Sequence, residues 1–154
     1  MKQRPSVLVV DDDAGIRKTL SQILRTKGYA VKAVKSGKHA IAASKKRFFN
    51  VALIDVRLQD IEGTVLIGKL KETEPRMIRI IVTGYPSMDS AIEAVNRNAD
   101  GYLVKPIDVH ELLAMIEKQL RKQREDLEYG EKKVAEYIET RVKSIEFEGV
   151  GKTL

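Results

Sequence analysis

The side chains best suited to chemistry in this 154-residue chain each come directly after a short apolar run. Aspartates occupy positions 11–13, and Asp55, Thr83 and Lys105 follow later runs. Carboxylate oxygens are preferred ligands of Mg²⁺, which is commonly held by one or two carboxylates together with phosphate oxygens. A hydroxyl donor and an ammonium group are what a transferring phosphoryl group needs. If these side chains meet, they favour magnesium-dependent phosphate chemistry on a carboxylate.

Five apolar runs are predicted to be strands and the segments between them helices. The runs comprise residues 7–10, 30–34, 51–54, 78–82 and 101–104. Three of them show no polar alternation, which is typical of strands covered on both faces. Apolar residues at helical spacing predict five helices. The first ends at Gly28, the second lies around residues 40–43, and the third runs from Val65 past Leu70 and ends before Pro75. The fourth begins near Ser87 or Ser90, and the fifth is capped by Asp108.

Strand and helix thus alternate five times within residues 1–120, which predicts an α/β fold. We expect a doubly wound, five-stranded parallel sheet with helices on both faces. The carboxyl ends of its strands would meet at one edge, where ligands bind in such folds. Asp11, Asp12 and Asp55 would repel one another in a partly dry cleft, and a hard divalent cation would relieve that repulsion.

Four motifs, in this order, resemble the receiver domain of two-component response regulators. They are Asp11-Asp12 after V-L-V-V, Asp55 in V-A-L-I-D-V-R-L-Q-D-I-E-G, Thr83 in I-I-V-T-G-Y, and Lys105-Pro106 in D-G-Y-L-V-K-P. The resemblance extends over residues 5–120. It implies a flavodoxin-like strand order of 2-1-3-4-5, and a signalling phosphoprotein that promotes only its own phosphorylation and dephosphorylation rather than an enzyme with an external substrate.

The resemblance implies that Asp55 is the phosphoacceptor. It would take the phosphoryl group from a phosphohistidine on a sensor histidine kinase or phosphotransfer protein, or from a small phosphodonor. Asp12 and Asp55 would contact Mg²⁺ directly, and Asp11 would act mainly through water. The backbone carbonyl of Arg57 would be a further ligand.

Further roles follow from the same resemblance. Thr83 would bind a phosphoryl oxygen, and Lys105 would pair with the phosphoryl group. A cis bond would precede Pro106. Tyr102 resembles the family's switch aromatic, which turns inward when Thr83 is drawn toward the phosphoryl group, whereas the alternative is an ordinary half-buried tyrosine of the sheet. Asp13 stands outside the metal site and is expected to cap the first helix.

Two large residues beside the acceptor are expected to influence how long the phosphoryl group lasts. Arg57 lies two residues after Asp55, and Tyr85 lies two residues after Thr83. Their bulk would obstruct the water that hydrolyses the acyl phosphate, so we expect slow decay. Arg57 also argues against a phosphatase of the haloacid dehalogenase type, which needs a second acid at that position.

The composition of the chain excludes several other kinds of functional site. The chain has no cysteine, which excludes disulfides, thiol catalysis and cysteine-ligated zinc. His39 and His110 are too few for a histidine-rich metal site. The glycines of residues 149–153 do not match a phosphate-binding loop, because Glu146 stands where its first glycine should be. No apolar run approaches the roughly 18 residues of a membrane span, so we expect a soluble, cytoplasmic protein with no membrane partner.

The formal net charge of +6 raises the question of nucleic-acid binding. Residues 119–154 hold eight basic and eight acidic side chains, so the excess lies in residues 1–118. The tight basic cluster there is residues 45–47, which has no interleaved aromatic residues to stack on bases. We interpret this cluster as a solvated helix end and expect no direct nucleic-acid binding.

Residues 121–154 are predicted to be a helical tail or linker with no recognisable output domain. The fifth helix is expected to extend, pause at Gly130 and resume with an apolar stripe over residues 134–145. Gln123 and Gly130 interrupt heptad continuity, so a parallel coiled coil, packing on the receiver, a homodimer and a linker to an absent domain all remain open. The second function considered is therefore a phosphorylation-independent interaction module that assembles through this tail. The downstream protein target is not specified by the sequence.

Overall fold

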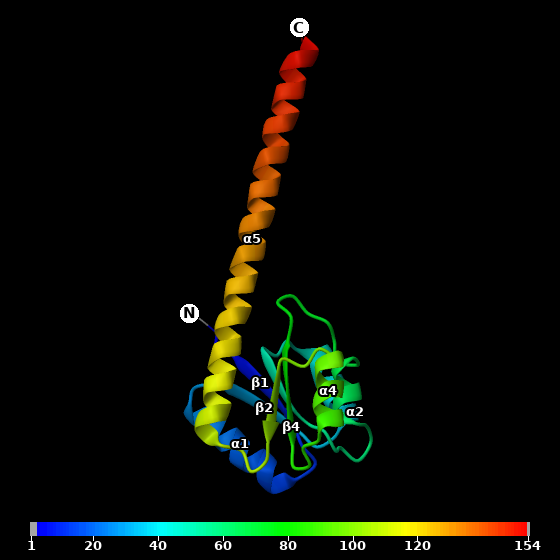
Figure 1. Cartoon of the computed structure of the whole chain (residues 1–154). Coiled ribbons are helices and arrows are strands. Elements are labelled where there is room, and N and C mark those ends of the chain that lie inside the picture. Colours follow the sequence, from blue (N-terminus) through cyan, green and yellow to red (C-terminus); the bar gives the residue numbers. More distant parts are fainter. Residues whose placement is uncertain (1–2, 154) are drawn as a thin grey trace. The chain divides into compact units, whose positions relative to one another are not determined.

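The computed structural model describes the backbone of residues 3–153 and the side chains of residues 3–145. Strands and helices alternate along the chain as predicted (Figure 1). The elements are β1 (Ser6–Val10), α1 (Ala14–Thr26), β2 (Ala30–Val34), α2 (Gly37–Lys46), β3 (Val51–Asp55), α3 (Gly63–Ile67), β4 (Ile78–Thr83), α4 (Met88–Asn96), β5 (Gly101–Val104) and α5 (Val109–Thr153).

The five strands form one parallel sheet in the order β2-β1-β3-β4-β5. This confirms the predicted fold class and strand order. Strand β1 pairs with both β2 and β3, and Val10 lies opposite Val34 on one side and Ile54 on the other. The chain therefore leaves β1 and β3 at the same edge of the sheet, which places the residues after these two strands side by side.

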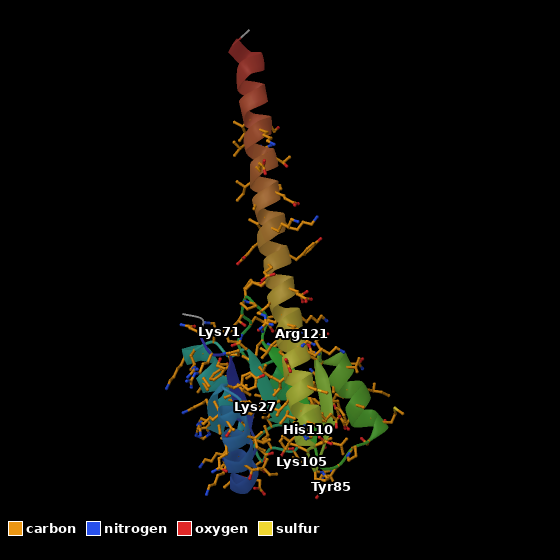
Figure 2. The ribbon with its side chains drawn as sticks, turned by 90° about the vertical axis from the view of Figure 1, so that its left-hand side faces the viewer. Lys27, Lys71, Tyr85, Lys105, His110 and Arg121 are labelled. Atoms are coloured by element: carbon orange, nitrogen blue, oxygen red, sulfur yellow. The ribbon has the colours of Figure 1, made fainter. Side chains whose placement is uncertain are left out.

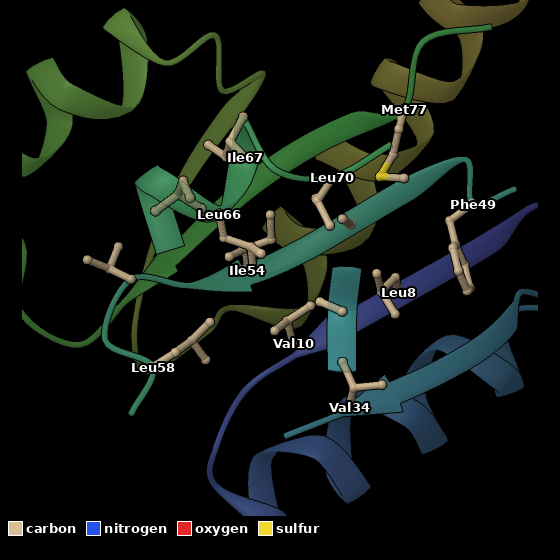
Figure 3. Packing of buried hydrophobic residues seen from close by; sticks show 14 of the residues in the cluster. Leu8, Val10, Val34, Phe49, Ile54, Leu58, Leu66, Ile67, Leu70 and Met77 are labelled. Atoms are coloured by element: carbon tan, nitrogen blue, oxygen red, sulfur yellow. The ribbon is translucent and has the colours of Figure 1, made fainter. Parts of the chain in front are cut away.

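Helices cover both faces of the sheet, because the strand residues alternate between two hydrophobic clusters. One cluster joins strand residues such as Leu8 and Ile54 to α2 and α3 (Figure 3). The other cluster joins Val9 and Leu53 to α1 and the first turns of α5. All of β1, β3 and β4 is buried, which explains why their sequences lack polar alternation.

Most predicted helix ends are confirmed. Gly28 ends α1 at a φ of +95°, a left-handed conformation that glycine adopts without steric cost. The Asp108 carboxylate accepts a hydrogen bond from the amide of Glu111 at 3.1 Å and so caps α5. Helix α3 is shorter than its apolar spacing predicts. It ends at Ile67, and Leu70 is buried beyond it, because the amide of Lys69 already bonds three residues back, to the carbonyl of Leu66.

Gly130 does not interrupt the last helix, contrary to prediction. Helix α5 continues from Val109 to Thr153, which includes the glycine-rich residues 149–153. One glycine costs a helix only about 1 kcal/mol, and the glutamate and lysines after it favour a helix. Contacts divide the chain into two compact units, residues 1–120 and 121–154. Among the described residues, no helix combines the length and apolar character needed to cross a bilayer.

Candidate functional site

Three aspartate side chains meet at the carboxyl edge of the sheet. Asp11 and Asp12 directly follow β1, and Asp55 is the last residue of β3. One carboxylate oxygen from each lies within 4.8 Å of the others. Asp11 and Asp55 are buried, whereas Asp12 is exposed. The structure thus brings together the three acids that the sequence assigned to one edge.

Lys105 contacts two of these carboxylates from the end of β5. Its Nζ donates to Asp11 Oδ2 at 2.9 Å and lies 3.5 Å from Asp55 Oδ2. The Lys105-Pro106 peptide bond is cis, as the resemblance implied. Figure 2 labels Lys105 and Tyr85 at the same end of the domain. One ammonium group therefore faces three carboxylates, and the cluster keeps an excess of negative charge.

Burial and the charges of the cluster shift the pKa values of Asp55 and Lys105. Burial raises the pKa of Asp55, the Asp11 carboxylate raises it further, and Asp12 adds a smaller effect. Lys105 and the amide of Arg57 oppose this rise without cancelling it. Burial alone would lower the pKa of Lys105, but its hydrogen bond to Asp11 and the nearby carboxylate charges outweigh burial and raise that pKa.

The donor set fits a hard divalent cation. The cluster offers only oxygen ligands, and three carboxylates share it with one ammonium group. Both features are what Mg²⁺ requires of a protein site. The amide of Arg57 donates to Asp55 Oδ1 at 3.4 Å, which holds the backbone that carries the Arg57 carbonyl beside the acceptor. Asp13 Oδ1 instead accepts from the amide of Ile16 at 3.0 Å and caps α1, as expected.

Thr83 is buried at the end of β4, and its hydroxyl accepts a hydrogen bond from the backbone two residues further along the chain. The amide of Tyr85 donates to Thr83 Oγ1 at 3.0 Å, which leaves the hydroxyl proton of Thr83 available as a donor. The Arg57 guanidinium stacks over the Tyr85 ring, 4.2 Å from the ring centre. The two large residues beside the acceptor are therefore in contact with each other.

Tyr102 connects the last strand to α4. Its side chain is partly buried against the cluster shown in Figure 3, and its hydroxyl lies 2.7 Å from Ser90 Oγ. Ser90 belongs to the first turn of α4, where it forms a capping box with Ser87. A χ1 rotation that moves the Tyr102 hydroxyl therefore breaks a contact with the start of α4.

The sequence reasoning gave no role to Gly63, although it lies within the motif around Asp55. A Cβ atom at this position would lie 2.2 Å from the backbone oxygen of Asp55. The amide of Gly63 also donates to the carbonyl of Val56 at 2.7 Å. Gly63 is the first residue of α3 and follows the N-cap residue Glu62, and a glycine inside the motif around Asp55 was the available signal of this close backbone approach.

A family model described as the response regulator receiver domain matches residues 7–117. The chain belongs to the response regulator receiver domain family. Receiver domains act as signalling switches, and this one carries the acidic cluster that is typical of the family.

Curated relatives of this receiver domain are longer proteins. The transcriptional regulatory protein ZraR of Escherichia coli is 37% identical over 114 residues, which cover 74% of this chain and 26% of the relative. The DNA-binding transcriptional regulator NtrC of Salmonella typhimurium is 33% identical over 118 residues, which cover 77% of this chain and 25% of the relative. The chain thus spans about a quarter of the length of the curated relatives it matches.

Solved structures of similar receiver domains match over most of their length. A CheY-like receiver domain protein of Methanospirillum hungatei has a TM-score of 0.77 and 36% identity, over 80% of this chain and 99% of that chain. A response regulator of Burkholderia pseudomallei, solved with a phosphorylated aspartic acid, a calcium ion and citrate, has a TM-score of 0.69 and 30% identity, over 79% of this chain and 72% of that chain.

Proposed function

We propose that this receiver domain is a phosphorylation-activated switch of a two-component system, with Asp55 as its phosphoacceptor. The phosphodonor would be a sensor histidine kinase or a phosphotransfer protein. One observation carries the proposal: the Asp55 carboxylate, at the end of a buried strand, meets two further carboxylates and the Lys105 ammonium. The phosphorylated aspartic acid in the similar Burkholderia protein supports it.

In the proposed transfer, an Asp55 carboxylate oxygen attacks the phosphorus of the donor phosphohistidine. A phosphorus–oxygen bond forms, the phosphorus–nitrogen bond breaks, and the histidine nitrogen takes the bonding electrons. Lys105 and the hydroxyl of Thr83 stabilise charge on the phosphoryl oxygens. Asp11, Asp12 and the carbonyl of Arg57 would hold Mg²⁺ together with Asp55. The bound ion supplies positive charge to neutralise the phosphoryl oxygens.

The switch would run from Thr83 to Tyr102. A phosphoryl group on Asp55 adds negative charge and acceptor oxygens, which draw the Thr83 hydroxyl toward the acceptor. The vacated space would admit the Tyr102 ring and release its contact with Ser90 Oγ. A protein target would then read the changed surface of α4 and β5.

The phosphorylated state should decay slowly. The Arg57–Tyr85 stack supports this proposal, because two large side chains in mutual contact obstruct water better than two separate ones. We expect Arg57→Ala/Tyr85→Ala to lose its phosphoryl group faster than the wild type, followed as acid-labile phosphate over time. Unchanged decay in the double variant would contradict this role.

The phosphoacceptor assignment is tested with phosphoramidate and MgCl₂ as a small phosphodonor. Intact-mass spectrometry should show one added phosphoryl group on the wild type and none on Asp55→Asn. Asp89→Asn is the control, because it removes an exposed carboxylate outside the acidic cluster, and it should be phosphorylated normally. Phosphorylation of Asp55→Asn to the wild-type extent would refute the proposal.

The second candidate, a phosphorylation-independent module that assembles through its tail, is favoured by one observation. Val134, Ile138 and Ile145 are each more than half exposed on α5. Light scattering with Mg²⁺ and beryllofluoride, a phosphoryl mimic, separates the candidates. A mass that doubles only when the mimic binds supports the switch, whereas a dimer in both states that Asp55→Asn also forms supports the tail module.

A further inference from the structure

Positive charge is concentrated in one segment of the domain. Residues 14–54 hold ten lysines and arginines and no aspartate or glutamate. The other residues of 1–118 hold ten basic and fourteen acidic side chains. The positive excess of the domain is therefore carried entirely by this segment.

The charged part of this segment folds into one lateral edge of the domain. Strand β2 is one of the two outer strands of the sheet. Helix α1 packs against it on one face, and α2 lies on the other face, where it packs against β1. Val31 and Ala33 pack in the cluster that contains α1, whereas Val34 packs in the cluster that contains α2. We call this surface, residues 14–47, the β2 edge.

The lysines of the β2 edge are all exposed, and no carboxylate pairs with any of them in the part of the chain that the structure describes. They are Lys18, Lys27, Lys32, Lys35, Lys38, Lys45 and Lys46. Lys27 precedes β2 and is labelled in Figure 2, Lys32 lies within the strand, and Lys35 directly follows it. Positive charge therefore runs along the whole length of the outer strand.

Nearby carboxylates do not neutralise these lysines. Asp60 accepts hydrogen bonds from the backbone amides of Gly37 and Lys38, at 3.0 and 2.9 Å, rather than from a lysine side chain. Two arginines of the edge are also occupied by backbone. Arg17 donates to the carbonyl of Asp11 and Arg25 donates to the carbonyl of Val31. These bonds position the two guanidinium groups and leave their positive charge in place. Seven of the ten cationic side chains of the edge are lysines, so most of the charge that faces a partner is carried by ammonium groups.

A hollow of about 580 Å³ lies between α1 and β2. Lys18 and Lys32 belong to its lining, together with Arg17 and Arg25. The β2 edge is thus concave as well as cationic, and a negatively charged chain could lie in it along the strand.

The composition of the β2 edge disfavours a protein partner. Protein interfaces are depleted of lysine and are built around exposed apolar or aromatic anchors. In residues 14–54 the one large apolar side chain that is exposed is Phe48, at 37%. Lysine is a flexible point charge, which suits a uniformly charged backbone better than a patterned surface. Stable anchoring at an anionic membrane combines a basic patch with a second, apolar signal, which the side chains of this edge do not supply.

We propose that the β2 edge binds the phosphate backbone of a nucleic-acid duplex without sequence preference. The lysines neutralise phosphates and release counterions, which makes the affinity strongly dependent on salt. This function is separate from phosphorylation, because no residue of the edge belongs to the acidic cluster. It replaces the expectation of no direct nucleic-acid binding, which treated the basic residues of 1–118 as scattered over helix surfaces, with a tight cluster at residues 45–47.

The test measures binding of the full chain to a fluorescent DNA duplex of about 20 base pairs and mixed sequence, between about 50 and 200 mM salt. The test variant is Lys18→Glu/Lys32→Glu/Lys35→Glu. The control is Lys118→Glu/Lys122→Glu/Lys132→Glu, which changes the net charge equally at exposed positions of α5. We expect the test variant to lose at least about tenfold in affinity and to lower the slope of log K against log salt by about 3.

The control should stay within about threefold of the wild type, and both variants should keep the wild-type circular dichroism. Asp55→Asn should bind the duplex normally, so failure of this proposal is distinguishable from failure of the phosphoacceptor assignment. Equal losses in both triple variants would overturn the proposal. Absence of duplex binding would also overturn it, whether or not vesicles of anionic lipid bind instead.

Discussion

The Asp55 carboxylate lies in a setting that opposes its negative charge. Burial and two neighbouring carboxylates raise its pKa above the ordinary value of 3.8. A group whose pKa is raised by folding stabilises the fold below its unfolded pKa, and this contribution is lost as the pH rises through the folded value. The acceptor therefore weakens the folded state at neutral pH when no metal is present.

Asp55→Asn should accordingly be more stable than the wild type at neutral pH in the presence of a chelator. The difference should shrink as the pH falls toward 3.8, because both proteins are then uncharged at this position. Urea unfolding at several pH values measures it. An equal advantage of the variant at every pH would show that the charge of Asp55 is not the cause.

Glycine is required at position 63 because the backbone of Asp55 leaves no room for a Cβ atom there. In Gly63→Ala the new Cβ would collide with the carbonyl of Asp55, so β3 and α3 must separate. We expect a loss of about 1–3 kcal/mol in unfolding free energy, together with slower phosphorylation by phosphoramidate.

Gly68→Ala is the matched control for Gly63→Ala. At Gly68 an added Cβ would meet only the carbonyl of Val65, at an ordinary 3.8 Å, and φ is −73°. This substitution should leave stability unchanged or raise it by up to about 1 kcal/mol. Equal effects of the two substitutions would exclude the collision as the cause.

At the scale of elements, Asp60 joins the loop after β3 to the start of α2. It accepts hydrogen bonds from the amides of Lys38 and Gly37, and these bonds lower its pKa. The contribution of a group with a lowered pKa is present above the unfolded value of 3.8 and is lost as the pH falls through the folded value. The link between the two elements should therefore fail in acid.

Asp60→Asn should destabilise the protein at neutral pH and have little effect in strong acid, where the wild type has also lost the charge. Urea midpoints across this range measure the difference. Asp89→Asn, at an exposed position in the first turn of α4, is the control for removal of one carboxylate. A constant difference for Asp60→Asn would indicate that its charge is irrelevant.

For the whole molecule, we propose that residues 1–120 fold without the tail. Every buried hydrophobic side chain in the described part of the chain lies between Val7 and Leu120. A chain that ends at residue 124, which leaves one turn beyond Leu120, should keep the cooperative thermal unfolding and the phosphoramidate reaction of the full chain. Loss of cooperative unfolding would place the domain boundary further along the chain.

Much of the fold was predictable because its signals are local. Continuous apolar runs such as Val7–Val10 indicate burial on both faces of a sheet. Gly28 marks a helix end through its left-handed backbone, and Asp108 marks a helix start through its capping side chain. The end of α3 and the continuity of α5 through Gly130 were not predictable. Each depends on small differences in hydrogen bonding that a single residue type does not determine.

The residues that end the strands can be identified from residue order alone. Because a parallel sheet places all those ends at one edge, this was enough to predict the meeting of Asp11, Asp12, Asp55 and Lys105. The contacts between residues far apart in the chain follow instead from tertiary packing. Lys105 and Asp11 are 94 residues apart, Gly63 packs against the backbone of Asp55, and Lys18 of α1 and Lys32 of β2 line one hollow. Distances of this kind depend on how the helices and strands pack, so they cannot be inferred from the spacing of residues along the chain.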